Sequence, residues 1–153
     1  MNYWLMKSEP DELSIDDLRV KKRWHWDGVR GYEARNYMRD QMRIDDLVIF
    51  YHSSCIPAGP AGIAKVASTP YPDFTQFDTK SKYYDAKATT EKPIWMMVDV
   101  AFVKRFARTI TRDELRAIPT LNDMKLWKRS RLSITPLTKK EFDVIVSLSK
   151  NLD

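Results

Sequence analysis

Short stretches in which apolar and polar residues alternate recur along the chain and predict a set of strands. Residues 47–52 are almost continuously apolar, which is typical of a buried strand. Residues 61–68 alternate and follow a loop rich in Ser, Pro and Gly, so we expect these two segments to pair as a hairpin. Residues 94–106 form the longest strand candidate. The remaining candidates are residues 3–6, residues 21–26 as a strand or extended segment, and residues 132–134.

Capping residues and helical spacing mark four further segments. Ser14 stands three residues before an aspartate, as an N-cap residue does, which predicts a short helix over 14–20. Residues 32–41 have helical spacing, and two capping boxes starting at Thr111 and Thr138 each predict a helix. In the last helix one stripe of side chains should dock on the core, namely Phe142, Ile145, Val146 and Ser149.

The order of these elements favours an α+β fold. Strands mix with capped helices, but no regular strand–helix–strand repeat occurs, which argues against a doubly wound parallel sheet. We expect antiparallel strands of unequal length in a closed or nearly closed sheet, with helices packed on its outside. The length of 153 residues is that of one ordinary domain, so residues 1–153 are predicted to form a single domain.

Composition excludes several classes of protein. The chain has one cysteine, Cys55, so no intrachain disulfide forms, and one cysteine with two histidines is too few for an ordinary zinc site. The longest apolar run is far shorter than the roughly 20 residues that span a bilayer. Four glycines show no phosphate-binding glycine pattern. We therefore predict a soluble cytoplasmic protein without metal, cofactor or membrane association, as a monomer or weak oligomer.

The distribution of charge is more informative than the net charge of +5. Residues 1–18 carry one basic and five acidic residues, whereas residues 19–43 carry eight basic and three acidic ones. Residues 102–131 carry nine basic and three acidic residues. Basic blocks of this kind suit a polyanion such as nucleic acid, although a solvated surface has the same composition. The candidate phosphate-contacting residues are Lys21, Lys22, Arg23, Arg35, Lys128 and Arg129.

Evidence for catalysis in the sequence is weak. Cys55 lies three residues after His52, but a cysteine nucleophile needs a base within hydrogen-bond reach and a lowered pKa, which sequence proximity does not supply. Paired acidic residues stand at helix starts or turns, where carboxylates act as caps. We predict no catalytic residue; the alternative is an enzyme acting on nucleotides or RNA through His52, Lys7 or Cys55.

Aromatic residues are interleaved with the basic ones, and aromatic faces stack on nucleobases. The densest case is Trp24-His25-Trp26. Strand alternation places both indoles on one face and His25 on the other. Two indoles on one face form either part of the core or one wall of a pocket. A small-molecule pocket without any nucleic-acid role is therefore a further alternative.

A series of short motifs resembles the EVE domain family over essentially the whole chain. The series comprises Lys7-Ser8-Glu9-Pro10, Trp26-Asp27-Gly28-Val29-Arg30, Tyr32-Glu33-Ala34-Arg35-Asn36, Phe50-Tyr51-His52-Ser53, Gly62-Ile63-Ala64, Tyr71-Pro72-Asp73, Tyr83-Tyr84-Asp85, Trp95-Met96-Met97-Val98-Asp99-Val100 and Arg131-Leu132-Ser133. The resemblance implies a PUA-like fold, a small bent β-barrel with antiparallel and mixed pairing flanked by helices. Such domains are similar in fold to YTH domains, which read N6-methyladenosine in RNA.

The resemblance also implies a function, that of a non-enzymatic module that reads a modified base in DNA or RNA through an aromatic pocket. Trp26 would form one aromatic wall, Tyr83 and Tyr84 a second one, and Asn36 would hydrogen-bond the base edge. In full, the implied base-binding residues are Lys7, Ser8, Trp26, Asn36, Tyr51, His52, Ser53, Tyr83, Tyr84, Trp95, Arg131 and Ser133.

One position departs from the family pattern. Many members have Asn where this chain has Gly31. The loss of that amide removes one possible hydrogen bond or helix cap. It leaves the expected fold intact and bears on which ligand the pocket selects.

Overall fold

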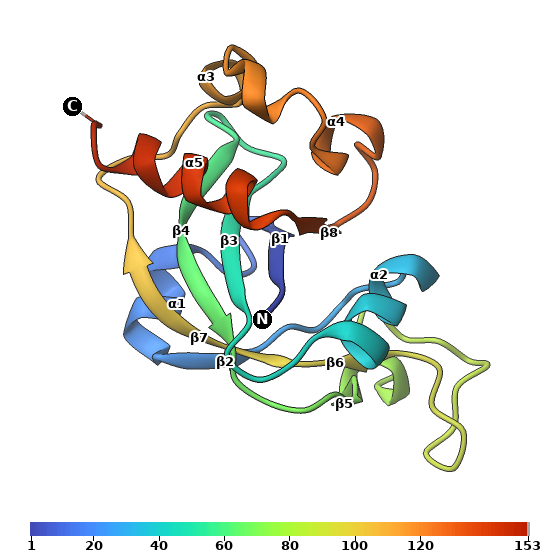
Figure 1. Cartoon of the computed structure of the whole chain (residues 1–153). Helices are drawn as coiled ribbons and strands as arrows, with labels where there is room; N and C mark the ends of the chain where they lie inside the picture. The colour runs from blue at the N-terminus through green and yellow to red at the C-terminus, as the bar shows by residue number, and fades with distance from the viewer. Residues whose placement is uncertain (153) are drawn as a thin grey trace.

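The computed structural model describes residues 1–152 and has an α+β fold built on one mixed six-stranded sheet (Figure 1). The strand order is β2-β7-β4-β3-β1-β8. Only the β1–β3 pair is parallel, and the other pairs are antiparallel. The strands are β1 (Tyr3–Ser8), β2 (Arg23–His25), β3 (Leu47–His52), β4 (Gly59–Val66), β7 (Asp99–Arg105) and β8 (Ile134–Leu137). A second, two-stranded sheet pairs β5 (Tyr71–Pro72) with β6 (Met96–Met97).

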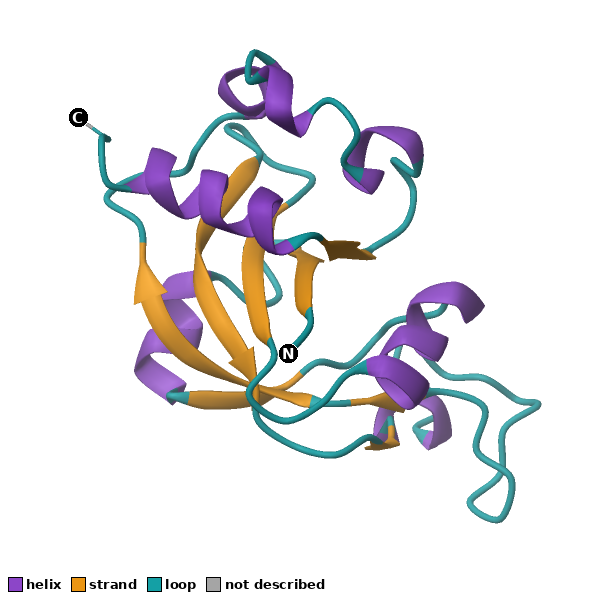
Figure 2. Cartoon of the chain, viewed as in Figure 1, coloured by secondary structure: helices purple, strands orange, loops and turns teal. Residues whose placement is uncertain are grey.

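Helices cover both faces of the large sheet. Figure 2 shows α5 lying across the strands, with α2 beside the long loop that joins β5 to β6 (residues 73–95) at one end of the sheet. The α-helices are α1 (Ile15–Lys21), α2 (Tyr32–Asn36), α3 (Arg112–Arg116), α4 (Lys125–Lys128) and α5 (Lys139–Ser149). A π-helix (Tyr37–Gln41) and two 3₁₀ helices (Phe74–Phe77 and Pro119–Leu121) complete the fold.

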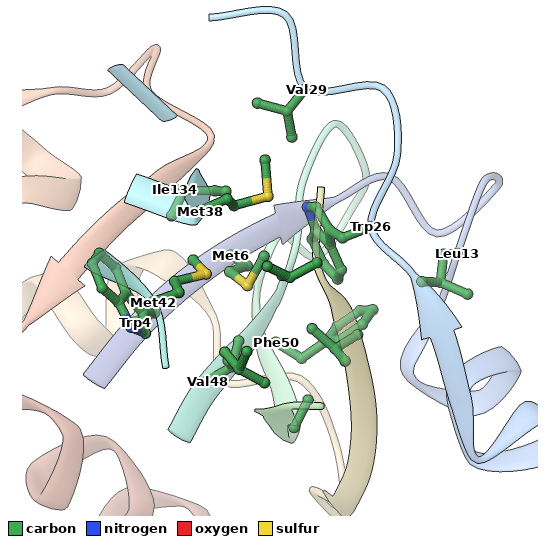
Figure 3. Close-up of a cluster of buried hydrophobic side chains, with 14 of the residues drawn as sticks. Trp4, Met6, Leu13, Trp26, Val29, Met38, Met42, Val48, Phe50 and Ile134 are labelled. Carbon is green, nitrogen blue, oxygen red and sulfur yellow. The ribbon is translucent and has the colours of Figure 1, made fainter. Parts of the chain in front are cut away.

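Strand alternation divides the core into two layers. Trp4 and Met6 of β1 belong to a cluster that also contains Val48 and Phe50 of β3 (Figure 3). Ile15 and Leu18 of α1 are part of the same cluster. Leu5, between Trp4 and Met6, joins a second cluster on the opposite face, under α3, α4 and α5. Because β3 alternates in the same way, the central strands are buried on both faces, as the continuous apolar run at 47–52 predicts.

The sheet bends where its register shifts. The pairing of β3 with β4 shifts after Phe50, and that of β4 with β7 shifts after Ile63. Gly62 lies between these points, and a Cβ there would stand 2.4 Å from the carbonyl oxygen of Lys104 and 2.7 Å from the Ile15 side chain. The absence of a side chain at Gly62 thus lets β7 and α1 approach β4 closely.

The main expectations for the fold are confirmed. The α+β class, the bent sheet flanked by helices and the β3–β4 hairpin are all present. Capping boxes open α1, α3 and α5 as predicted, and in each the N-cap hydroxyl accepts a hydrogen bond from the N3 backbone N–H. Within the described chain the sheet is open, because no strand pairing joins its two edge strands, β2 and β8.

Three details of the prediction are wrong. Residues 94–106 are not one strand: the chain leaves the β5 partner at Val98 and continues in β7 beside β2 and β4, so β4 is the longest strand. The last strand covers 134–137 rather than 132–134, because Leu132 closes a turn onto Arg129. The helix predicted over 32–41 is α-helical only to residue 36 and then becomes a π-helix.

All three residues of the Trp24-His25-Trp26 segment line one cavity of the molecule. The strand β2 ends at His25, and the Trp26 N–H continues the pairing by donating to the carbonyl oxygen of Val98 at 2.9 Å. Trp24 is 37% exposed and lies under the ammonium group of Lys21, whereas Trp26 is 5% exposed.

No helix within residues 1–152 has the length and apolar character needed to cross a membrane.

Candidate nucleic-acid interface

A cavity of about 610 Å³ opens where β1 and β3 end. The parallel pairing of these strands sets Lys7 beside Tyr51 and Ser8 beside His52. The residues that follow the two strands therefore lie close together at the same end of the sheet. The segment after β2, the loop around residue 83 and the segments near α3 and α4 complete its walls. Eight predicted base-binding residues line this cavity: Lys7, Ser8, Trp26, Tyr51, Ser53, Tyr83, Arg131 and Ser133.

Trp26 is held in place by both its backbone and its ring. Its N–H donates to the carbonyl oxygen of Val98 at 2.9 Å, and its indole packs edge-to-face on Phe50 with ring centroids 5.4 Å apart. Figure 3 shows Trp26 beside Phe50 in the first core layer. Trp26 is therefore at once a core residue and a residue of the cavity wall.

Tyr83 also lines the cavity and is fixed through its main chain. The guanidinium of Arg30 donates two hydrogen bonds to the carbonyl oxygen of Tyr83, at 3.1 and 2.8 Å. Gly28 has φ of +84°, and a Cβ at this position would come within 2.7 Å of the Tyr83 ring. The ring therefore packs directly on the backbone of residue 28, where only glycine fits without strain.

Asp73 joins these two segments. Its carboxylate accepts hydrogen bonds from the Gly28 N–H at 2.8 Å, from Arg30 at 3.1 Å and from the Thr75 N–H at 2.8 Å. The side chain is fully buried, so this charge is neutralised and hydrogen-bonded inside the protein. The Trp26–Arg30 segment and the long loop are thus joined through one carboxylate.

Glu12 ties Tyr83 to the first loop of the chain. The Tyr83 hydroxyl donates to its carboxylate oxygens at 2.8 and 2.9 Å, and the ammonium group of Lys82 pairs with the same carboxylate. Burial and the nearby Glu12 raise the pKa of Tyr83, which keeps the phenol protonated at neutral pH. The hydrogen bond from Lys82, with smaller contributions, lowers the pKa of Glu12.

The structure adds cavity residues that the sequence reasoning missed. Asp27 follows Trp26 directly and lines the cavity, and burial raises the pKa of its carboxyl group. Arg112 also lines the cavity, although its sequence context indicates only a capped helix start. Asp27 stands inside the Trp26–Arg30 motif and could have been found there, whereas no local signal points to Arg112.

Four predicted base-binding residues lie outside the cavity. The amide oxygen of Asn36 accepts hydrogen bonds from Arg35 at 3.1 and 2.9 Å. Trp95 is buried, and its indole donates to Asp85 at 2.9 Å. Tyr84 is 43% exposed. His52 accepts a hydrogen bond at Nε2 from the backbone N–H at the start of α1, at 3.1 Å, and burial lowers the pKa of its ring.

The predicted phosphate-contacting residues also lie outside the cavity, and most have partners in the protein. Arg23 pairs with Asp99 at 3.0 Å, and Arg129 pairs with Glu33 at 2.6 Å. The ammonium group of Lys21 lies 3.9 Å from the Trp24 ring centroid, and that of Lys128 lies 3.7 Å from Asp123. Arg35 donates a hydrogen bond to the Ile94 carbonyl oxygen at 3.0 Å. Lys22 is exposed.

The environment of Cys55 disfavours a role as a nucleophile. Burial raises the pKa of the Cys55 thiol, which reduces the fraction of reactive thiolate. The thiol donates a hydrogen bond to the carbonyl oxygen of Pro57 at 3.4 Å rather than to a base. Residues 1–152 contain no cluster of three or more His, Cys, Asp or Glu side chains suited to a metal ion.

The fold and cavity define a class: a small α+β module with a cavity walled by aromatic and basic residues at the ends of two parallel strands. The EVE domain family matches residues 2–148, and the chain belongs to this family. Mouse thymocyte nuclear protein 1 is 42% identical over 168 residues, which covers 97% of this chain and 74% of the mouse protein.

Solved structures agree with this assignment. Human THYN1 protein, solved in complex with DNA containing 5-methylcytosine, is 40% identical with a TM-score of 0.94 and full coverage of both chains. A YTH domain of Zygosaccharomyces rouxii, solved with N6-methyladenosine RNA, has a TM-score of 0.56 at 19% identity, covering 99% of this chain and 86% of that one. The second likeness shows the fold alone, and it confirms the expected similarity to YTH domains.

One expectation is overturned by these comparisons. The prediction of a cytoplasmic protein is wrong, because the relatives from mouse, rat and human are all thymocyte nuclear protein 1, a nuclear protein by name. The sequence contains nothing within the domain that distinguishes these compartments, so the prediction rested on the absence of a targeting segment.

Proposed function

We propose that this chain is a non-enzymatic reader of a modified nucleobase, acting as a single domain. The observation that carries the proposal is the cavity of about 610 Å³ lined by Trp26 and Tyr83, in a chain 40% identical to a protein crystallised with 5-methylcytosine DNA. The base would leave the nucleic-acid stack and enter between the two aromatic walls. The hydrogen bond that occupies His52 Nε2 and the raised pKa of the Cys55 thiol support a binding role over a catalytic one.

The energetics of base capture require contacts beyond stacking. Stacking on an aromatic side chain contributes roughly 1–3 kcal/mol per base, and extruding a paired base costs a few kcal/mol. These contributions nearly cancel, so contacts to phosphates must supply much of the net affinity. Binding should therefore weaken as the salt concentration rises.

Selectivity for the modification must come from polar contacts as well as from the modified group. A buried methyl group contributes about 0.8 kcal/mol, which is about a fourfold preference. Ser53 and Asp27 line the cavity and make no side-chain hydrogen bond to another residue in the described chain, so both are available to a base edge. Ser8 is already committed, because its hydroxyl donates to the Leu13 carbonyl oxygen at 2.7 Å.

The test is a binding panel measured by fluorescence anisotropy. The probes are single- and double-stranded oligonucleotides with one central cytosine, 5-methylcytosine, adenine or N6-methyladenine, each at low and at physiological salt. We expect one modified probe to bind more tightly than its unmodified counterpart, and all binding to weaken with salt. Equal affinity for every probe would leave a non-specific basic protein, and no binding at low salt would leave a small-molecule pocket.

A variant at Tyr83 connects that preference to the cavity. Tyr83→Leu removes the stacking surface but keeps the carbonyl oxygen that Arg30 holds, so the loop should stay in place. We expect the preferred probe to bind about tenfold more weakly. The matched control is Phe74→Leu, an exposed aromatic residue outside the cavity. Trp26→Ala is a poor test, because truncating a buried Trp costs about 3–5 kcal/mol of stability.

A further inference from the structure

Among the described residues, four cations line the cavity, and they differ in whether a carboxylate accompanies them. Arg30 pairs with Asp73 at 3.1 Å. Within residues 1–152, no carboxylate lies within ion-pair distance of the cavity cations Lys7, Arg112 or Arg131. The fold brings them together from three distant parts of the sequence.

The surroundings of Lys7 and Arg112 orient them without neutralising them. The ammonium group of Lys7 donates to the carbonyl oxygen of Ser130 at 2.9 Å and lies 5.9 Å from the Tyr51 ring centroid. The guanidinium of Arg112 lies 5.6 Å from the Trp127 ring centroid, and the backbone N–H of Arg112 donates to the Ala58 carbonyl oxygen at 3.2 Å. Neutral carbonyl groups and rings hold these side chains, and their charges remain uncompensated.

The two cations act on each other. Burial and the charge of Arg112 both lower the pKa of Lys7. Like charges that share a partly buried site repel each other, and a bound anion relieves that repulsion. In the free protein this arrangement is unfavourable, which is the electrostatic condition expected of an anion-binding site.

Three acidic residues of the described chain also line the cavity. Asp27 adjoins Trp26 and Glu12 is hydrogen-bonded to Tyr83, so these two carboxyl groups lie beside the aromatic residues. Glu9 follows the end of β1 but forms no ion pair with the cations there, which come from β1 and from the segments at α3 and α4. A nucleotide whose base lies between the aromatic walls would thus direct its phosphate toward the cations.

We propose that Lys7, Arg112 and Arg131 form a subsite for the phosphate that adjoins the captured base. This inference rests on the proposed function and deepens it. It gives Lys7 and Arg131 a role other than the predicted base contact, and it adds Arg112, which the sequence reasoning did not select. It also places the principal phosphate contact inside the cavity.

The test is a double-mutant cycle between one arginine and one phosphate. The probe is a single-stranded oligonucleotide with one 5-methylcytosine, carrying either ordinary phosphates or a neutral methylphosphonate on the 5′ or the 3′ side of that base. For the wild-type protein, we expect one of the two substitutions to weaken binding about tenfold. For Arg112→Ala, the ordinary probe should bind about tenfold more weakly, and the same substitution should then have less than about a twofold further effect.

Two further variants distinguish a defined phosphate subsite from general electrostatic attraction of the oligonucleotide to the protein surface. Lys150→Ala removes one positive charge at the end of α5, away from the cavity, and should change affinity less than about twofold. Lys7→Met, which retains most of the side-chain length, should reduce the slope of log affinity against log salt by about one. Equal losses for Lys150→Ala and Arg112→Ala, or an undiminished methylphosphonate effect in Arg112→Ala, would overturn the inference.

A titration with inorganic phosphate distinguishes failure of this inference from failure of the proposed function. Wild-type protein should show phosphate-dependent NMR shifts at the backbone amides of Ser53, Ser54 and Ser133, which line the same cavity, and Arg112→Ala should not. Such shifts without any preference for a modified base would refute the reader and retain the anion site. A preference for a modified base without such shifts and without coupling in the cycle would refute the subsite alone.

Discussion

The cations on the two sides of the cavity differ in whether a carboxylate neutralises them. On the side of the long loop, Arg30 and Asp73 neutralise each other and satisfy the backbone around them. On the side where β1 ends, Lys7 and Arg112 interact with each other, and neither forms an ion pair with a carboxylate in the described structure. One arginine of the cavity is thus neutralised within the protein, whereas the other keeps its charge available. Variants on the two sides should therefore differ in their effects on stability and on binding.

The largest effect should follow from breaking the neutralised side. Asp73→Ala removes the acceptor of Gly28 and Thr75 and leaves the Arg30 charge without its partner. We expect a loss of about 3 kcal/mol in the free energy of unfolding, measured by urea denaturation. Asp78→Ala, in an exposed turn of the same loop, should change it by less than about 0.5 kcal/mol. Similar effects for both would show that Asp73 does not anchor the loop.

A smaller effect should follow from disturbing the contact between Tyr83 and the backbone. Gly28→Ala places a methyl group where the Tyr83 ring lies, at a positive φ. We expect a loss of about 2 kcal/mol together with weaker binding of the preferred probe. Gly31→Ala is the matched control, because a Cβ at residue 31 meets no atom within 4 Å. An equal loss in both would assign the effect to general chain flexibility.

His52 tests whether a neutral ring secures α1 to the end of β3. Burial lowers its pKa below 6.5, so the unfolded chain binds more protons in that range and stability falls as the pH drops below about 6.5. His52→Gln should be about 1 kcal/mol less stable at neutral pH, because the hydrogen bond from the Ile15 N–H is weakened. The difference should shrink on acidification, as followed by thermal unfolding at several pH values. A difference independent of pH would contradict this account.

The smallest effect should come from the side with unpaired cations. Lys7→Met should raise the free energy of unfolding by less than about 0.5 kcal/mol, because it removes a charge that repels Arg112. The lowered pKa of Lys7 means that the unfolded chain binds more protons below pH 10.5, so wild-type stability recovers as the pH approaches that value. Unfolding at neutral and alkaline pH measures this trend. A marked loss of stability in Lys7→Met would show that this cation is structural.

The parts of the fold that depend on local sequence could be predicted. The capping boxes at Thr111 and Thr138 and the β3–β4 hairpin involve residues close along the chain. The break at Val98 could not be predicted, because it depends on which strands lie beside β6 and β7. The indoles of Trp24 and Trp26 were expected to form either part of the core or one wall of a pocket; both residues line the cavity, and Trp26 is also buried in the core.

The same limit applies to the candidate site, because local motifs identify some of its residues and tertiary packing places others. The motifs of the EVE domain family selected Trp26 and Tyr83, which the fold brings to one cavity. Asn36 and His52 were expected in the pocket, yet they hydrogen-bond Arg35 and the start of α1. Arg112 could not be selected from its surroundings in the sequence, because its place beside Lys7 arises only from the packing of α3 against the end of the sheet.

The attachment of the long loop through the Tyr83 carbonyl has a consequence for protein engineering. Arg30 holds an atom that every amino acid possesses, so the loop should keep its path whatever side chain stands at position 83. That position is therefore a natural site for a saturation library. Larger, smaller or polar side chains there would reshape one wall of the cavity while the scaffold stays constant. Selection from such a library against oligonucleotides with different chemical marks would turn one domain into a set of laboratory reagents.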